Sequence, residues 1–167
     1  KEIIEEVIHH LNLYNRLYPL LVGKNGVGKS SIAIGVTQYI LEGKIYTELQ
    51  NFRVIEFDFN NLLSESINEE EISKNFKSII FELKQIKDII LVIDNVEVVL
   101  QEIFVKSGVL AGFMQLLKSN IFHCIGIMNN ISYENFQYSA LSKFFQKIDV
   151  HESNNLETRM FLEHWRE

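Results

Sequence analysis

The residues Gly23-Lys24-Asn25-Gly26-Val27-Gly28-Lys29-Ser30 decide the fold of this chain. They match the pattern G-x-x-x-x-G-K-[ST], in which glycines let the backbone turn successive N–H groups toward phosphate oxygens. An apolar run, Leu20-Leu21-Val22, leads into this loop, and a helical pattern over 30–41 follows it. The loop therefore lies between a strand and a helix, which is the setting that phosphate binding by this motif requires.

The loop predicts a bound nucleotide, ATP or ADP, together with Mg2+. We expect Lys29 to reach the β and γ phosphates and Ser30 to ligate the metal, while the helix N-terminus adds partial positive charge. The alternative is an accidental glycine turn, which average residue usage makes rare, about one chance match in a hundred such chains. The residues expected to contact the nucleotide are Gly23, Lys24, Asn25, Gly26, Val27, Gly28, Lys29, Ser30 and Ser31.

Strand and helix patterns alternate along the rest of the chain. The run Ile89-Ile90-Leu91-Val92-Ile93 is continuous and apolar, as in a parallel strand buried on both faces. This alternation predicts an α/β fold with a mainly parallel sheet. The expected strands are 20–22, 54–59, 89–93, 123–128 and 148–150, and the expected helices are 4–11, 30–41, 69–87, 109–117 and 156–165.

The composition excludes several classes of function. With 167 residues and a formal net charge of -6, the chain is about one domain long and lacks the clustered Lys and Arg that hold nucleic acid. No apolar run approaches the roughly 18 to 20 residues of a membrane span. Cys124 is the single cysteine, so an internal disulfide is excluded, and we expect it to be buried on a strand. We therefore predict a soluble protein with no nucleic-acid partner and no membrane span.

A second acidic position follows the most apolar strand. Asp94 ends that strand, where a carboxylate can hold Mg2+ beside the phosphates. Hydrolysis also needs a group that orients or deprotonates the attacking water. In ring-forming ATPases a glutamate normally follows this aspartate, but here Asn95 stands there and cannot accept a proton. Glu97 is the less favoured candidate for the base, and the alternative for it is a solvated loop carboxylate.

Taken in order, motifs from residue 2 to about residue 162 resemble the first nucleotide-binding module of the Clp-type AAA+ unfoldases, the group containing ClpB, ClpC and ClpA. Y-P-L-L-V-G at 18–23 resembles the family's N-P-V-L-I-G, and I-I-L-V-I-D at 89–94 resembles I-I-L-F-I-D. Shorter matches are F-D-F at 57–59, C-I-G at 124–126, Ala140-Leu141 with Phe145-Gln146, and Glu152 with Glu157-Thr158. The resemblance implies a large α/β subdomain over 1–150, a three-layer P-loop NTPase fold with a five-stranded parallel sheet and helices on both faces. It also implies the start of the helical lid over 151–167.

Several family positions differ here. The paired arginine fingers, which reach the neighbouring subunit's ATP, fall on Lys143 and Phe144, and a lysine keeps one charge but loses the fork geometry. The pore loop K-Y-R-G falls on 67–70, which reads I-N-E-E and has lost aromatic and basic character. The sensor threonine falls on Asn129, with Asn130 as the alternative if the alignment shifts by one residue, and asparagine is a common sensor residue in AAA+ proteins. The changed positions serve hydrolysis and substrate pulling, whereas the nucleotide-holding positions remain.

The resemblance implies an ATP- or ADP-binding module of a Clp-family chaperone or protease-associated unfoldase. Its implied partners are Clp-family subunits in a homo- or hetero-hexamer, with a Clp protease or a polypeptide substrate beyond them. We expect slow or absent hydrolysis. The alternatives are an active motor in which Glu97 or a partner subunit provides the missing group, a scaffold that uses nucleotide only to shape a ring interface, and an unrelated loop NTPase such as a kinase.

The Ile-, Asn- and Lys-rich composition resembles that of proteins from AT-rich genomes. Together with a degenerate Clp-type module, it is similar to the Clp proteins encoded by reduced plastid genomes, including those of apicomplexan parasites. The expected location is therefore a plastid (apicoplast) stroma, with the cytoplasm as the alternative.

Overall fold

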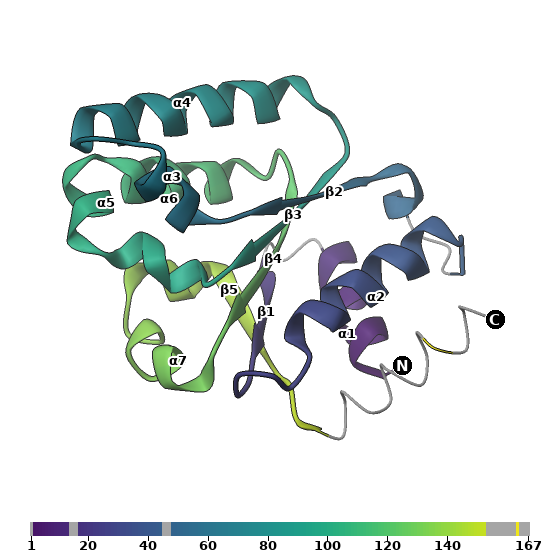
Figure 1. The fold of residues 1–167 in the computed structure, drawn as a ribbon. Helices are drawn as coiled ribbons and strands as arrows, with labels where there is room; N and C mark the ends of the chain where they lie inside the picture. The colour runs from purple at the N-terminus through teal and green to yellow at the C-terminus, as the bar shows by residue number, and fades with distance from the viewer. Residues whose placement is uncertain (1, 14–16, 45–47, 153–162, 164–167) are drawn as a thin grey trace.

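The computed structural model describes residues 2–13, 17–44, 48–152 and 163, and it has the predicted layered α/β fold (Figure 1). A five-stranded sheet in the order β2-β3-β4-β1-β5 forms its centre, and every neighbouring pair of strands is parallel. Because parallel strands all end at the same edge, the segments that follow β1, β3 and β4 meet there. The strands are β1 (Tyr18–Val22), β2 (Arg53–Phe57), β3 (Ile89–Asp94), β4 (His123–Met128) and β5 (Phe145–Asp149).

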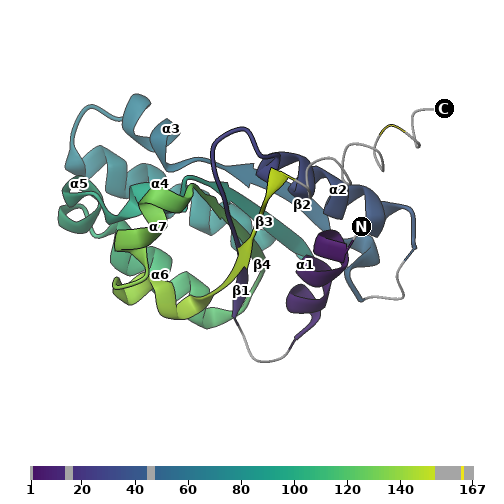
Figure 2. The ribbon, with the colours of Figure 1, turned by 90° about the horizontal axis from the view of Figure 1, so that it is seen from below.

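Helices cover both faces of the sheet, and Figure 2 shows α1 and α2 on the opposite side from α4 and α6. Side chains of each strand alternate between the faces, so Leu21 packs with α1 and α2, whereas Leu20 and Val22 pack with the other helices. Two separate apolar clusters result, which confirms the predicted three layers. The helices are α1 (Glu2–Asn12), α2 (Lys29–Leu41), α3 (Phe59–Ser64), α4 (Glu69–Gln85), α5 (Glu102–Lys106), α6 (Val109–Ser119) and α7 (Asn130–Phe136).

Some predicted boundaries are wrong, and the reasons are local. The strand expected over 54–59 ends at Phe57, because the Asp58 side chain accepts a hydrogen bond from the Asn60 N–H at 2.8 Å and caps α3. The strand expected over 148–150 begins already at Phe145, and the helix expected to reach residue 87 ends at Gln85. The helix expected over 156–165 falls almost entirely outside the described residues, as does the pair Glu157-Thr158.

Short elements were not predicted at all. They are α3, α5, α7 and the 3-10 helices η1 (Glu48–Asn51), η2 (Val96–Leu100) and η3 (Ala140–Phe144). None is long enough to repeat an apolar spacing over several turns, which is the signal that reveals a helix in a sequence. Two of them, η2 and α7, begin directly after the ends of β3 and β4 and so contribute to the site described below.

The expectation that Cys124 is buried on a strand is confirmed. It lies buried on β4, and burial raises the pKa of its thiol. Gly43 follows the end of α2 in a left-handed conformation, with φ 61°, as a helix stop at glycine requires. None of the helices within the described ranges is long and apolar enough to cross a membrane.

Candidate nucleotide-binding site

The glycine loop joins the buried end of β1 to the first turn of α2, as the motif predicts. Gly26 and Gly28 have positive φ angles of 81° and 95°, which favour glycine. Gly23 is required for a different reason, since a Cβ atom there would lie 2.5 Å from the backbone oxygen of Val150. Gly28 is also the N-cap of α2 and has no side chain, so the N–H groups of the first helical turn stay accessible to an anion.

Lys29 lies beneath this loop. Its Nζ donates hydrogen bonds to the backbone oxygens of Gly23 and Lys24, both at 2.8 Å, and the residue is only 9% exposed. Burial lowers the pKa of Lys29, while the negative charges of Asp94 and Glu97 act in the opposite direction. The ammonium group is thus held at the loop and lies within electrostatic reach of both carboxylates.

Ser30 and Asp94 are the predicted metal ligands, and the structure brings them together. Both are exposed and line one hollow of about 420 Å3 at the strand ends, together with Glu56 and Asp58. Oxygen ligands suit Mg2+, which keeps several waters and phosphate oxygens and needs few protein ligands. Among the residues that the structure describes, no group of three or more His, Cys, Asp or Glu could hold a metal by itself. The Ser30 hydroxyl and the Asp94 carboxylate are donors that fit Mg2+ carried by a nucleotide.

Asn95 and Asn129 directly follow the last residues of β3 and β4, at the same edge of the sheet as the loop. Asn95 has a left-handed backbone, φ 49°, and its N–H donates to Asp94 Oδ1 at 2.9 Å. Asn129 caps α7, with Oδ1 accepting from the Ser132 N–H at 2.7 Å. Because Oδ1 is engaged in this cap, the NH2 group is the part of the predicted sensor that can donate to a phosphate.

The alternative interpretation of Glu97, a solvated carboxylate on a loop, is wrong. It lies half-buried on η2, and its Oε2 atom is buried without a hydrogen-bond partner among the described residues. Burial raises the pKa of Glu97, which a backbone hydrogen bond, a hydrogen bond from the Ser132 side chain and the charge of Lys29 partly oppose. The structure thus places Glu97 among Lys29, Asp94 and Ser132.

Other predicted positions lie apart from the loop. Lys143 is exposed on η3, ahead of the first residue of β5 and so toward the opposite edge of the sheet, with Nζ 5.4 Å from the ring centroid of Phe144. At the pore-loop position, Asn68 caps α4 by accepting from the Glu71 N–H at 2.9 Å. Ile67, just before it, is 91% exposed. Asn68, which stands at the position of the tyrosine in the family's K-Y-R-G pore loop, thus has a structural role as a helix cap.

A second hollow, of about 500 Å3, lies on the other side of the loop. Its lining includes Gly23 and Lys24 from the loop, Asn130 after β4, Asp149 at the end of β5 and His151 beyond it. Sequence reasoning missed Asp149 and His151 as site residues, because no local pattern marks them. Only the sheet order β4-β1-β5 brings them beside the loop.

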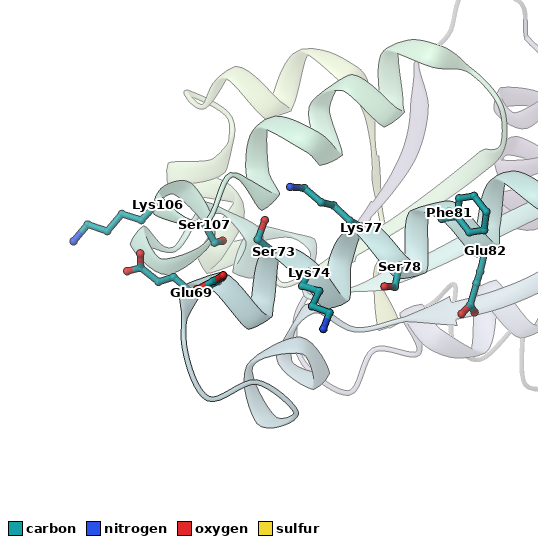
Figure 3. A pocket seen from close by; sticks show the side chains of 10 residues that line it. Glu69, Ser73, Lys74, Lys77, Ser78, Phe81, Glu82, Lys106 and Ser107 are labelled. Carbon is teal, nitrogen blue, oxygen red and sulfur yellow. The ribbon is translucent and has the colours of Figure 1, made fainter.

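A larger hollow lies away from the loop. It measures about 870 Å3 and is an open groove of mixed charge along α4, with Ser73, Lys77 and Phe81 on that helix and Lys106 and Ser107 at one end (Figure 3). No loop residue and no residue from the strand ends lines it. Its size therefore does not make it the nucleotide site.

Comparison with known proteins agrees with this geometry. The model of the ATPase family associated with various cellular activities (AAA) matches residues 19–152. The chloroplastic chaperone protein ClpC4 of Oryza sativa subsp. japonica is 30% identical over 168 residues, covering 98% of this chain and 18% of that protein. Chaperone protein ClpB of Pseudomonas putida is 30% identical over 160 residues, covering 93% and 19%.

Solved structures give the same result. The ADP complex of Hsp104 from S. cerevisiae superposes with a TM-score of 0.76 at 25% identity, covering 90% of this chain and 21% of that one. Hsp104 with ATPγS and FITC-casein gives the same TM-score and identity. The chain spans about a fifth of the length of the curated relatives it matches. The predicted resemblance to Clp-type modules is confirmed, and the chain belongs to the AAA family of ATPases.

Proposed function

We propose that this chain is an ATP- or ADP-binding module of a Clp-type chaperone or protease-associated unfoldase, and that it hydrolyses ATP slowly. The observation that carries the proposal is the loop between β1 and α2, with Lys29 held at its backbone and Asp94 close by at the end of β3. Gly23, Gly26 and Gly28 each have a conformation or a close approach that suits glycine. Phosphate binding is what this combination of features serves.

Each residue of the loop has a separate task in this proposal. The N–H groups at the start of α2 bind phosphate oxygens, and Lys29 places its charge at the β and γ phosphates. The Ser30 hydroxyl and the Asp94 carboxylate hold Mg2+, which when bound neutralises charge on the β and γ oxygens. Slow hydrolysis follows from position 95, where asparagine cannot accept a proton, and from position 143, where lysine lacks the guanidinium fork.

The names of the relatives support a proposal for the ring partners and the location of this chain. Several are named Clp chaperones, and two are named ATP-binding subunits of a Clp protease. The word subunit in these names supports assembly with Clp-family subunits, for which we propose a homo- or hetero-hexamer with a Clp protease or a polypeptide as the further partner. The chloroplastic relative from rice supports a plastid stroma as the location.

The experiment compares nucleotide binding and turnover in wild type, Lys29→Met and Lys24→Met. A fluorescent ATP analogue with Mg2+ reports affinity, and phosphate release reports turnover. We expect Lys29→Met to weaken binding at least tenfold, about 1.4 kcal/mol, because it removes the buried cation at the loop. Lys24→Met, which changes an exposed loop lysine, is the matched control and should have a smaller effect.

The two parts of the proposal can fail separately. If wild type does not bind the analogue, or Lys29→Met binds it equally well, the nucleotide-binding role is wrong. If wild type binds and turns over at about 1 per second or faster, as typical enzymes do, the slow-hydrolysis part is wrong.

A nucleotide-dependent scaffold is the second candidate, and the substitutions at positions 95 and 143 favour it. It predicts that nucleotide drives assembly while turnover is absent. Mass photometry with and without ATP, run beside the phosphate-release assay, separates this candidate from a slow ATPase.

A further inference from the structure

The turn that follows β3 fixes the position of Glu97. Val96 and Val99 of η2 are fully buried, and residues three apart in a 3-10 helix eclipse one another, so one side of this turn is anchored in the apolar core. Glu97 lies between these two valines and is only half-buried. The packing of Val96 and Val99 in the core therefore fixes the backbone position of Glu97.

Groups at or beyond the ends of three different strands act on the carboxyl group of Glu97. Lys29, from the junction of the loop with α2, and Asp94, from the end of β3, both act on it electrostatically. Ser132 of α7 hydrogen-bonds to it through its side chain. The N–H of the same serine is bound by Asn129, the predicted sensor, at 2.7 Å. Glu97 thus lies among the groups expected at the γ phosphate.

One oxygen of this carboxyl group has no partner. Oε2 of Glu97 is buried and accepts no hydrogen bond from the described residues. Buried acceptors are paired in the great majority of cases, with water or ligand donors included, so an unpaired one requires an explanation. An acceptor beside Lys29 and the sensor position suits a water molecule that approaches a bound nucleotide.

We infer that Glu97 is the catalytic carboxylate that holds the attacking water, in place of the glutamate that the family has at position 95. The inference rests on the proposed function, because it needs a γ phosphate beside Lys29. The water oxygen forms a bond to the γ phosphorus while the bond to the β,γ-bridging oxygen breaks, and that electron pair leaves with ADP. One water proton passes to Glu97 and then to the product phosphate, which restores the carboxylate.

The decisive comparison is wild type against Glu97→Gln, with Glu134→Gln as the matched control. Glu134 is exposed on α7, two residues beyond Ser132, and lines neither hollow beside the loop, so its variant removes a nearby carboxylate charge without touching the site. Phosphate release under single-turnover conditions and affinity for the ATP analogue are measured on the whole chain. We expect Glu97→Gln to hydrolyse about 10²-fold more slowly with affinity within twofold of wild type, and Glu134→Gln to match wild type.

A double variant guards against a purely structural effect. Asn95→Glu combined with Glu97→Gln should regain hydrolysis, since the carboxylate is restored at the family's position. A structural glutamate that merely pairs with Ser132 would leave Glu97→Gln as fast as wild type, and that result overturns the inference. So does a wild type that binds nucleotide but releases no phosphate above the uncatalysed rate. Failure of wild type to bind nucleotide instead overturns the proposed function.

Discussion

The segment from Val22 to Ser30 and the segment from Asp94 to Glu97 lie on either side of the end of β4, yet their geometry has different origins. In the first, neighbouring residues along the chain supply the strand end, the turn and the helix start. In the second, Glu97 is surrounded by groups from β1–α2 and α7 that are distant in the sequence. The phosphate-holding half of the site is thus local, whereas the water-activating half depends on tertiary packing.

This difference bears on how each half tolerates change. The loop depends on backbone conformations that only a few residue types can adopt, so its sequence is tightly constrained. The second half needs a carboxylate within reach of one water, and different positions around the strand ends can provide it. A site can therefore keep its loop while the base moves from position 95 to position 97.

The largest predicted effect tests whether the loop depends on its close approach to the end of β5. Gly23→Ala should lower the free energy of unfolding by about 1–3 kcal/mol, because a Cβ atom 2.5 Å from a backbone oxygen forces β1 and the end of β5 apart. Nucleotide affinity should fall as well. Urea denaturation and binding of the fluorescent analogue measure the two effects.

Gly26→Ala is the control for this substitution. A Cβ atom there meets no other atom within 4 Å, and the positive φ of 81° is the only obstacle. The expected loss of stability is therefore smaller, about 1 kcal/mol. Equal losses at the two positions would show that close approach to Val150 has no special role.

The two halves of the site also differ in how much of each could be predicted from the sequence. Every predicted strand is present, because continuous apolar runs between turn signals identify buried parallel strands, and the loop was placed by its glycines. The interpretation of Glu97 as solvated failed, because its burial depends on η2 and on Ser132, 35 residues further along the chain. Asp149 and His151 were missed for the same reason, since only the sheet order brings them to the loop.

Asn95 gives a second, smaller test of the comparison. Its left-handed backbone, φ 49°, suits asparagine better than glutamate, so Asn95→Glu should destabilise the fold by about 1 kcal/mol even though it restores the family's residue. Asn95→Gly should be neutral or slightly stabilising if backbone strain dominates. Thermal unfolding of the two variants measures this difference. A glutamate variant as stable as wild type would mean that the turn after β3 adapts to its residue.

The smallest expected effect separates the two tasks of Asn129. Its Oδ1 caps α7 by accepting from the Ser132 N–H at 2.7 Å, so Asn129→Ala should lower stability by about 1 kcal/mol. Asn129→Asp keeps an acceptor for the cap and loses only the NH2 donor, so its stability should stay close to that of wild type. If the NH2 group contacts the γ phosphate, the aspartate variant should nevertheless lose hydrolysis. Full hydrolysis by the stable aspartate variant would mean that Asn129 only caps the helix, and that the water-activating half is built without a sensor at this position.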